Sequence, residues 1–582
     1  MEEKQRRGSR SGNSRDSGRR LIVWLCALLL LAILGIVGWR SKGSAWYARW
    51  RDDRLVTSAE ALLAAGKIKD AGMAARRLFQ QDVNNVRAMR IMAQIASKMG
   101  LRDTVLWRSR IADLEPDRVE SQIELAQAAL VFQDLITARV ALDRFPPKEQ
   151  DSLFYHETAG AIYYGLRDFL RAEFHFTKAL QSEPTNELRQ LNLIRVQLSL
   201  PEETSRMAAR EMLGRIAPAS PNYRIALDLL TRDALNRQDI AQAVDFSAKL
   251  SSVTNAAFSD HLLRLAVLKF SDRPAFTNKL EELKSVAIQQ PKSLAEFINW
   301  QIMNGAGASA MAWVRMLPPE LLKTFGPGMA VAELYVAVND WLGLRNWVRG
   351  ADWGYWQCLR FAYEARAVHN LPHDEQTPGT IAGLWAKAIQ SARSTASLLE
   401  TLATSAANWR MATQAEETLW EIANGISSQE NALMTLFREY LLTDNTFGQY
   451  RVARKLLQLN NRNLAAKNNT IYLGLLLKLD APDLVRLAEE LYQAAPSEAV
   501  YTTTYAFALS RQNRLTEALT QMEKLPLMEL DKPGISLTFG YLLAEAGDRN
   551  RAREYLTKAQ AGKLLPEEQK LLDEAKVKAR MQ

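Results

Sequence analysis

The sequence predicts an all-α fold, in which antiparallel helix pairs stack into an α/α superhelical solenoid that follows a single N-terminal transmembrane helix. Two observations predict it. Small or apolar residues recur about every 34 positions from residue 52 onward, and residues 21–39 form an apolar run without a charge. The chain of 582 residues is long for one globular domain. A repeat array escapes that limit because each unit contacts only its neighbours.

The apolar run is predicted to anchor the chain in a membrane. Residues 1–20 are rich in Arg, Ser and Gly and are predicted to form a disordered basic tail. Residues 21–39 would span roughly 28 Å as a helix, close to the hydrocarbon thickness of a bilayer. A cleaved secretory signal is the alternative, but its apolar region would be shorter, and Gly35-Ile36-Val37-Gly38 makes a poor cleavage site. Residues 40–51 are then a juxtamembrane linker.

The distribution of charge suggests which side of the membrane holds the body. Six Lys/Arg lie within fifteen residues before the apolar run and five within fifteen after it, so the positive-inside rule slightly favours a cytoplasmic N-terminus. The body is then expected on the exoplasmic side, in the periplasm of a Gram-negative bacterium. Residues 1–40 carry a net charge of +5 out of the total of +9. The rest of the chain carries little net charge and lacks the concentrated basic face that nucleic-acid binding needs.

The strongest repeat unit is DSLFYHETAGAIYYGLRDFLRAEFHFTKALQSEP, residues 151–184. Ala159 and Tyr163 share a face of its first predicted helix, and Ala172 and Phe176 share a face of its second. Residues equivalent to Ala172, here called the marker residues, recur at spacings of 33 to 35 apart from an insertion near residue 201 and a break after residue 344. They are Ala71, Val105, Ala138, Ala172, Ala209, Ala243, Phe276, Ala310, Leu344, Ala415, Tyr450, Leu484, Ala518 and Ala552.

This pattern resembles the tetratricopeptide repeat (TPR), a 34-residue helix–turn–helix unit, although His156 stands where that family usually has Trp. Gly66, Gly100, Gly305 and Gly547 each stand five residues before a marker and are predicted to lie in the turns. The register divides the body into a TPR-like array over residues 52–344, an irregular Trp-rich joint over 345–392 with a loop at 371–380, a second array over 393–565, and a capping helix over 566–582.

The residue types argue against catalysis. Only five histidines occur, and the tightest cluster is His369-Asn370-Leu371-Pro372-His373-Asp374-Glu375. Pro372 prevents one continuous helix from bringing both imidazoles to one face, so an exposed loop is favoured over a metal site. No set of nucleophile, base and acid can be nominated. We therefore expect no enzyme, no cofactor, no metal and no small-molecule substrate.

The TPR resemblance implies that side chains of each first helix line a concave groove that binds extended segments of partner proteins. Carried over onto this chain, it nominates a set of groove residues whose alternative role is a solvated helix face: Arg87, Arg90, Gln94, Lys98, Phe154, Glu157, Tyr164, Thr503, Phe507 and Tyr541. The Lys/Asn/Arg clamp by which some members of the family hold a terminal carboxylate is not matched.

Nine of the 14 tryptophans lie between residues 300 and 420, where they either fill a core or form a ligand surface. Two functions follow. The first is a membrane-tethered, non-enzymatic scaffold for partner proteins, which by family analogy suits envelope assembly, secretion or polysaccharide export. The second is a glycan-binding or glycan-processing accessory protein that uses the Trp-rich region. Burial of Trp353 and Trp356 would favour the first, and their exposure in a groove would favour the second.

Overall fold

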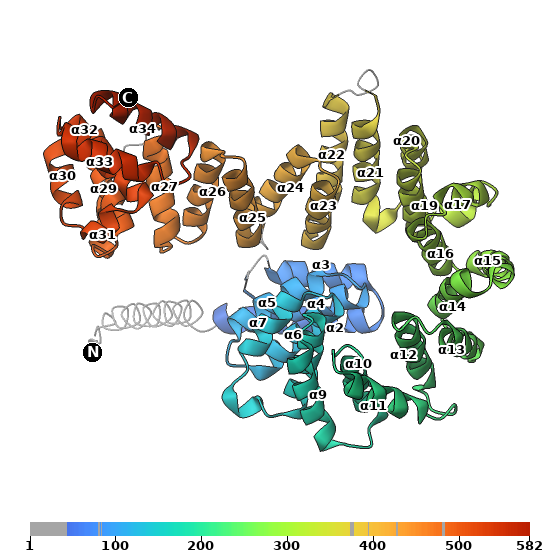
Figure 1. Ribbon diagram of the computed structural model, residues 1–582. Coiled ribbons are helices and arrows are strands. Elements are labelled where there is room, and N and C mark those ends of the chain that lie inside the picture. Colours follow the sequence, from blue (N-terminus) through green and yellow to red (C-terminus); the bar gives the residue numbers. More distant parts are fainter. Residues whose placement is uncertain are drawn as a thin grey trace, which may run out of the picture. The chain divides into compact units, whose positions relative to one another are not determined.

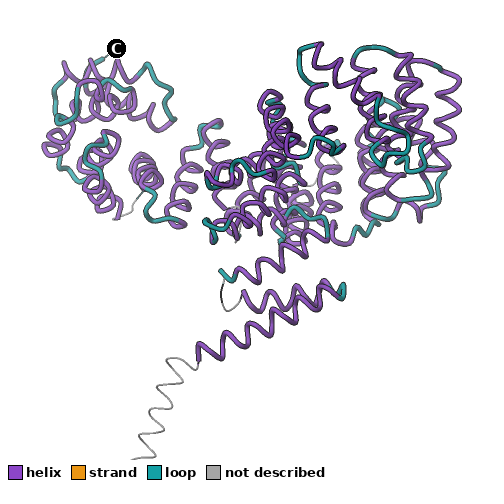
Figure 2. The backbone as a smooth tube through the Cα atoms, turned by 90° about the horizontal axis from the view of Figure 1, so that it is seen from below, coloured by secondary structure: helices purple, strands orange, loops and turns teal. Residues whose placement is uncertain are grey.

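The computed structural model describes residues 44–581, apart from 80, 81, 83, 373–377, 394, 426–428 and 480–482. The predicted basic tail (1–20) and transmembrane helix (21–39) lie outside the described residues. Within the described part, helices and loops alternate without a strand (Figure 2). None of the helices in that part combines the length and the apolar character that a bilayer crossing requires.

The chain divides into two compact units. The first, Met1–Asp272, is a succession of helix pairs (Figure 1). Its helices are α2 (Ser44–Ala64), α3 (Ile68–Phe79), α4 (Val86–Lys98), α5 (Asp103–Leu114), α6 (Val119–Val131), α7 (Leu135–Asp143), α8 (Leu153–Gly165), α9 (Phe169–Ser182), α10 (Glu187–Gln197), α11 (Glu203–Gly214), α12 (Tyr223–Asn236), α13 (Ile240–Ser252) and α14 (Phe258–Ser271), with the 3-10 helix η2 (Pro147–Glu149) before α8.

The second unit, Arg273–Gln582, continues the alternation. Its helices are α15 (Arg273–Ala287), α16 (Pro291–Met303), α17 (Gly307–Val314), α18 (Pro319–Leu322), α19 (Phe325–Ala337), α20 (Trp341–Arg349), η3 (Gly354–Trp356), α21 (Gln357–Asn370), α22 (Pro378–Ala392), α23 (Ala396–Asn408), α24 (Ala412–Asn424), α25 (Gln429–Leu442), α26 (Thr446–Leu459), α27 (Leu464–Leu476), α28 (Asp483–Ala494), α29 (Ala499–Arg511), α30 (Leu515–Met522), α31 (Leu527–Leu530), α32 (Pro533–Glu545), α33 (Arg549–Ala559) and α34 (Pro566–Lys578).

The turn inside each helix pair shows the repeat most directly. A residue with positive φ recurs there, at Gly66, Gly100, Gln133 and Arg167 in the first unit, with spacings of 34, 33 and 34. In the second unit the series Arg410, Asp444, Lys478, Asn513 and Gly547 has spacings of 34, 34, 35 and 34, and Arg580, directly after α34, continues it at 33. The four predicted turn glycines all have positive φ, a conformation that costs glycine nothing. The predicted TPR-like helical array is confirmed.

The packing inside the strongest unit explains why its small residues are small. Ala159 on α8 and Ala172 on α9 are fully buried, and Phe176 is almost so. A Cβ atom added to Gly160 would stand 2.8 Å from the Phe176 ring, so only glycine permits this helix crossing. Ser152 and Asp168 cap the two helices through hydrogen bonds from the amides of Tyr155 and Arg171.

The structure divides the chain into its two units after Asp272, outside the predicted joint at 345–392. The predicted joint contains the helix pair α21 and α22, preceded by the short helix η3. Furthermore, α22 begins at Pro378, inside the predicted loop 371–380, because proline at the first helical position already has a helical φ and needs no amide hydrogen there.

Candidate protein-binding surfaces

Helix α4 carries the first group of predicted groove residues. The side chains of Arg87, Gln94 and Lys98 are exposed, and Arg90 is partly buried. Arg87 forms an ion pair with Asp53 of α2, and Arg90 forms one with Glu115. The Lys98 ammonium donates a 3.2 Å hydrogen bond to a backbone carbonyl of α2. The polar side of α4 is thus accessible, and its cations are held by contacts to α2 and to the end of α5.

Helix α8 carries the second group, Phe154, Glu157 and Tyr164, all partly buried. Glu157 accepts a 2.7 Å hydrogen bond from the guanidinium of Arg189 in the next repeat, which orients both side chains. The Tyr164 ring lies 5.8 Å from the ring of Phe169. Phe154 packs beside the apolar core of α6 and α7. These three residues form a mixed apolar and acidic surface, in contrast to the basic surface of α4.

The third group is covered. Thr503 is 4%, Phe507 0% and Tyr541 9% exposed. The hydroxyl of Thr503 donates to the carbonyl of Ala499 one helical turn earlier. Phe507 makes ring contacts with Tyr541 and with Tyr472. These residues contact other parts of the same unit and are not accessible to a partner in this conformation.

A row of exposed apolar side chains on the second helices of the first unit is the surface that sequence reasoning missed. Each residue is between 43% and 77% exposed. The row, here called the outer stripe, consists of Ile136 and Val140 on α7, Leu170 and Phe174 on α9, and Met207 on α11. Ile136, Leu170 and Met207 stand two residues before their markers, and Val140 and Phe174 stand two after. The register alone could therefore have identified the stripe.

Three arginines beside the outer stripe form ion pairs. Arg139 lies 3.9 Å from Asp143, Arg171 lies 3.5 Å from Asp168, and Arg206 lies 2.7 Å from Glu203. Each stripe helix therefore has at least one such ion pair at its surface. The surface around the stripe is close to electroneutral, so contacts made there depend on apolar burial more than on long-range attraction.

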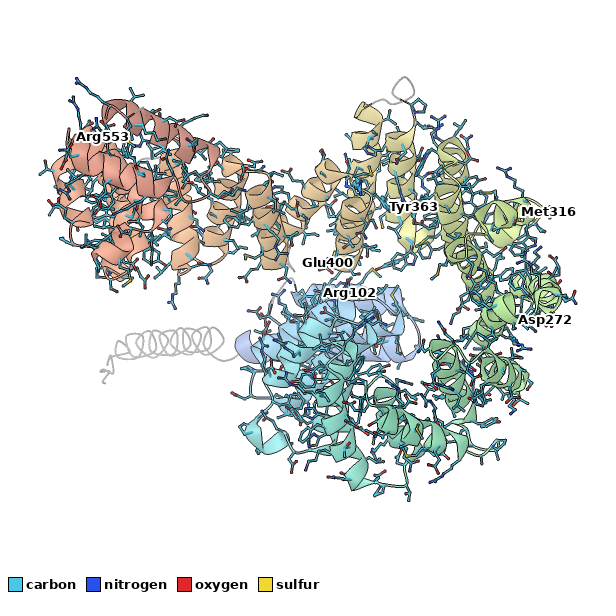
Figure 3. The ribbon with its side chains drawn as sticks, viewed as in Figure 1. Arg102, Asp272, Met316, Tyr363, Glu400 and Arg553 are labelled. Carbon is cyan, nitrogen blue, oxygen red and sulfur yellow. The ribbon has the colours of Figure 1, made fainter. Side chains whose placement is uncertain are left out.

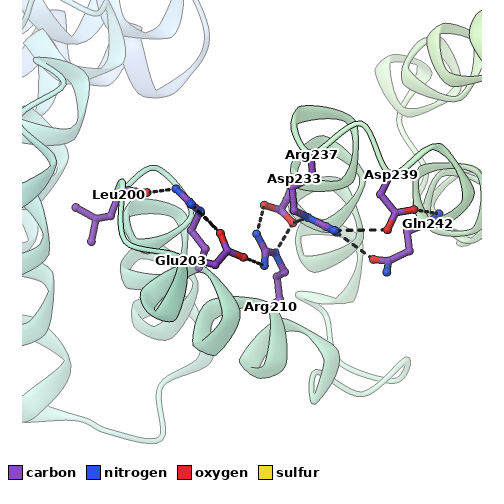
Figure 4. Close-up of polar contacts among 8 residues, drawn as sticks. Leu200, Glu203, Arg210, Asp233, Arg237, Asp239 and Gln242 are labelled. Atoms are coloured by element: carbon purple, nitrogen blue, oxygen red, sulfur yellow. Dashed lines mark hydrogen bonds and ion pairs between the residues drawn. The ribbon is translucent and has the colours of Figure 1, made fainter.

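An ion-pair network fixes the helix that ends the stripe. The carboxylate of Asp233, buried on α12, accepts hydrogen bonds from Arg210 of α11 at 2.7 Å and from Arg237 at 2.9 Å (Figure 4). Arg206 of α11 also donates to the carbonyl of Leu200 at 2.7 Å. Loss of Arg210 or Arg237 would leave the buried carboxylate with one arginine in place of two, which weakens this contact. The network therefore holds α11 rigidly against α12.

The tryptophans of the second unit pack mostly against other side chains of that unit. Trp353 and Trp385 are buried, and the indole N–H of Trp385 donates to the hydroxyl of Thr418 at 2.9 Å. Trp356 is partly buried and stacks on Phe325 with ring centroids 4.8 Å apart. Tyr363, labelled on α21 in Figure 3, is buried with its ring 4.9 Å from that of Trp409. Core packing accounts for these contacts, and they give no support to a glycan surface.

Two histidines of the strongest repeat unit, His156 and His175, lie side by side. Nδ1 of His156 lies 2.9 Å from Nδ1 of His175, and Nε2 of His156 lies 3.3 Å from Asp151. Burial, and then the neighbouring His156 and Arg171, lower the pKa of His175 to about 4. Burial raises the pKa of Cys358 to about 11, which makes a poor nucleophile. No group of three metal-ligating side chains occurs among the residues that the structure describes.

Comparison with known proteins adds the following. No protein-family model and no curated protein matches the sequence. Among solved structures, the chain is similar to one in the crystal structure of the APC/C hetero-tetramer Cut9–Hcn1, with 13% identity, a TM-score of 0.26, and coverage of 90% of this chain and 96% of that one. It is also similar to one in the structure of Naa15/Naa10 bound to HypK-THB, with 12% identity, a TM-score of 0.23, and coverage of 91% and 78%.

Proposed function

We propose that this chain is a non-enzymatic interaction scaffold, tethered to a membrane by residues 21–39, which binds a partner protein through its first unit. The outer stripe is the observation that carries the proposal. Monomeric soluble proteins rarely leave a large apolar patch in water, and such patches mark sites that another macromolecule covers. Here the exposed apolar side chains occupy equivalent positions in three successive repeats.

The charge around the stripe favours a protein as the occupant. An anionic membrane surface or a nucleic acid is held by unpaired Lys and Arg side chains. The flanking arginines on α7, α9 and α11 are instead paired with carboxylates. An approximately neutral, apolar protein face would bury Leu170 and Phe174 without leaving a charge unpaired.

The predicted groove residues on α4 and α8 provide a second contact region for the same scaffold. Its exposed cations Arg87 and Lys98 suit acidic side chains of an extended partner segment, and Glu157 beside Tyr164 suits a segment with apolar and basic residues. Glu157, Arg87 and Lys98 already make contacts between repeats, and Arg90 is paired with Glu115 at the end of α5. Binding there would therefore need little further ordering of side chains.

The experiment compares full-length variants in intact membranes by chemical crosslinking and quantitative mass spectrometry. The stripe variant is Leu170→Ser with Phe174→Ser, and the control is Lys178→Ser, at an exposed position of the same helix. Loss of two buried apolar anchors should reduce the recovery of a specific partner by about tenfold or more. The control should leave it unchanged. Equal recovery from the wild type and the stripe variant, at equal protein abundance, would refute the proposal.

A further inference from the structure

Three aromatic residues form a ladder along the first helices of the last hairpins. Tyr472 of α27, Phe507 of α29 and Tyr541 of α32 each stand six residues before a turn residue with positive φ, so they occupy the same repeat position. The ring centroids of Tyr472 and Phe507 are 6.0 Å apart, as are those of Phe507 and Tyr541. The ladder thus lies on the face that the TPR resemblance assigns to partner binding.

The C-terminal helix α34 packs against α32 and α33 (Figure 1). Its Leu571, Leu572 and Ala575 are buried in the apolar core that also contains α32 and α33. The oxygen Oε1 of Glu568 accepts a 2.7 Å hydrogen bond from the hydroxyl of Tyr472. A helix that only caps the end of the stack would contact the last hairpin alone, whereas α34 reaches back to α27.

Polar contacts extend this reach by one more helix. Glu567 accepts a hydrogen bond from the hydroxyl of Thr446 at the start of α26. Lys563, just before α34, lies 2.8 Å from Asp444 in the turn before α26, and Glu574 lies 3.6 Å from Lys478 in the turn after α27. The acidic side of α34 therefore faces α26 and α27, and its apolar side faces α32 and α33.

The two sides of α34 differ in how easily their contacts with neighbouring helices can be broken. The ion pairs Lys563–Asp444 and Glu574–Lys478 are exposed, and exposed pairs of this kind contribute little to stability. The Glu567 and Glu568 contacts join hydroxyl groups that water could satisfy if α34 moved away. The side of α34 that faces α26 and α27 is thus held mainly by exchangeable polar contacts.

From this geometry we propose that α34 occupies, within its own chain, a helix-binding surface formed by α26, α27, α32 and α33, next to the aromatic ladder. In trans, that surface takes an acidic amphipathic helix of a partner protein, with two adjacent carboxylates in its first turn and leucines four residues later, as in Glu567-Glu568 and Leu571-Leu572. Binding of the partner helix then requires that α34 first moves away and uncovers the ladder. This proposal concerns the second unit and does not depend on the outer stripe.

The test uses the full-length protein and a fluorescein-labelled peptide with the sequence of residues 563–581. The releasing variant is Glu567→Ala with Glu568→Ala, and the control is Lys570→Ala, at an exposed position of the same helix. We expect faster hydrogen exchange in α34 of the releasing variant and peptide binding at least about tenfold tighter than to the wild type or the control. A peptide lacking both glutamates should not bind. Unchanged exchange in α34, or equal peptide binding by all three proteins, would overturn the proposal.

A second measurement needs no variant and so does not depend on how a variant folds. Native-state hydrogen exchange of the wild type in increasing urea should show α34 opening at a lower concentration than α32 and α33, because its opening leaves the last hairpin intact. If α34 opens together with α32 and α33 in one cooperative step, α34 is an integral part of their core. It could then not be displaced by a partner helix, and the proposal would be wrong.

Discussion

The hydroxyl of Tyr472 donates a 2.7 Å hydrogen bond to Oε1 of Glu568, a residue 96 positions later in the chain. The other oxygen of that carboxylate accepts a hydrogen bond from the amide of Leu565, at the start of α34. Burial, and then the nearby Glu568 carboxylate, raise the pKa of Tyr472 well above its usual value. The phenol therefore keeps its proton and remains a donor, and the bond joins α27 to the end of the chain.

Substitutions at this bond should show energetic coupling. Glu568→Ala removes a charged acceptor and should lower the local free energy of opening of α34 by about 1.5–3 kcal/mol, whereas Tyr472→Phe should cost about 1 kcal/mol. Hydrogen exchange of α34 amides measures both. If the two residues act through their mutual bond, the double variant loses less than the sum. Strict additivity would show that the bond contributes nothing.

Acid should loosen the α8–α9 hairpin selectively. The pKa of His175 in the folded chain is about 4, below its ordinary value of 6.5, so the unfolded hairpin binds the proton more readily. The stability that depends on neutral His175 is complete above about pH 6.5 and is lost as the pH falls through about 4. His156 and Arg171 repel the charged form, while Asp151 faces His156 and not His175.

Hydrogen exchange between pH 7 and pH 4, corrected for intrinsic rates, measures this effect. Protection of α8 and α9 should fall more than that of α12 and α13, which contain no histidine. His175→Phe keeps a ring beside Tyr163, where the two rings now stack 5.5 Å apart, and should abolish the difference. An equal acid response of both hairpins in the wild type would contradict the expectation.

Truncation should lower the stability strongly at one phenylalanine of α9 and hardly at all at another. Phe176 is 6% exposed and packs against Gly160, whereas Phe174 is 55% exposed. Phe176→Ala should cost about 3–5 kcal/mol, as for other buried aromatics, while Phe174→Ala should change stability by less than about 0.5 kcal/mol. Urea unfolding of the first-unit hairpins, followed by hydrogen exchange, compares them. The Phe174 ring does touch His156 and His175 edge-on, and comparable losses for both variants would mean that these contacts stabilise the hairpin as much as burial of Phe176 does.

Membrane attachment is a prediction from the sequence of residues 21–39. The full-length protein should stay with the membrane after a high-salt wash, because an apolar helix of that length inserts by burial and not by charge. Protease added to spheroplasts should digest the body from outside. Release of intact protein by salt, or a body that external protease cannot reach, would refute the predicted topology.

The repeat register could be predicted because it depends on local residues: small markers such as Ala172 and turn residues such as Gly547. The position of Phe507 within the repeat could also be predicted, but its burial could not. Phe507 is covered in part by the rings of Tyr472 and Tyr541 from the neighbouring repeats. Periodicity along the chain also contains no information about contacts between residues as distant as Tyr472 and Glu568. The division after Asp272 likewise has no marker in the sequence. Pro378 is ambiguous, since proline both ends one helix and begins another.

The outer stripe is tested most directly by a photo-crosslinking amino acid placed at Leu170 in the full-length protein, with the same substitution at Lys178 as the matched control on α9. Irradiation of intact cells should give one protein adduct of defined mass from position 170 and none from position 178. An adduct only with lipid, an adduct only with a second copy of the chain, or no adduct from position 170 would contradict the assignment of the stripe to a partner protein.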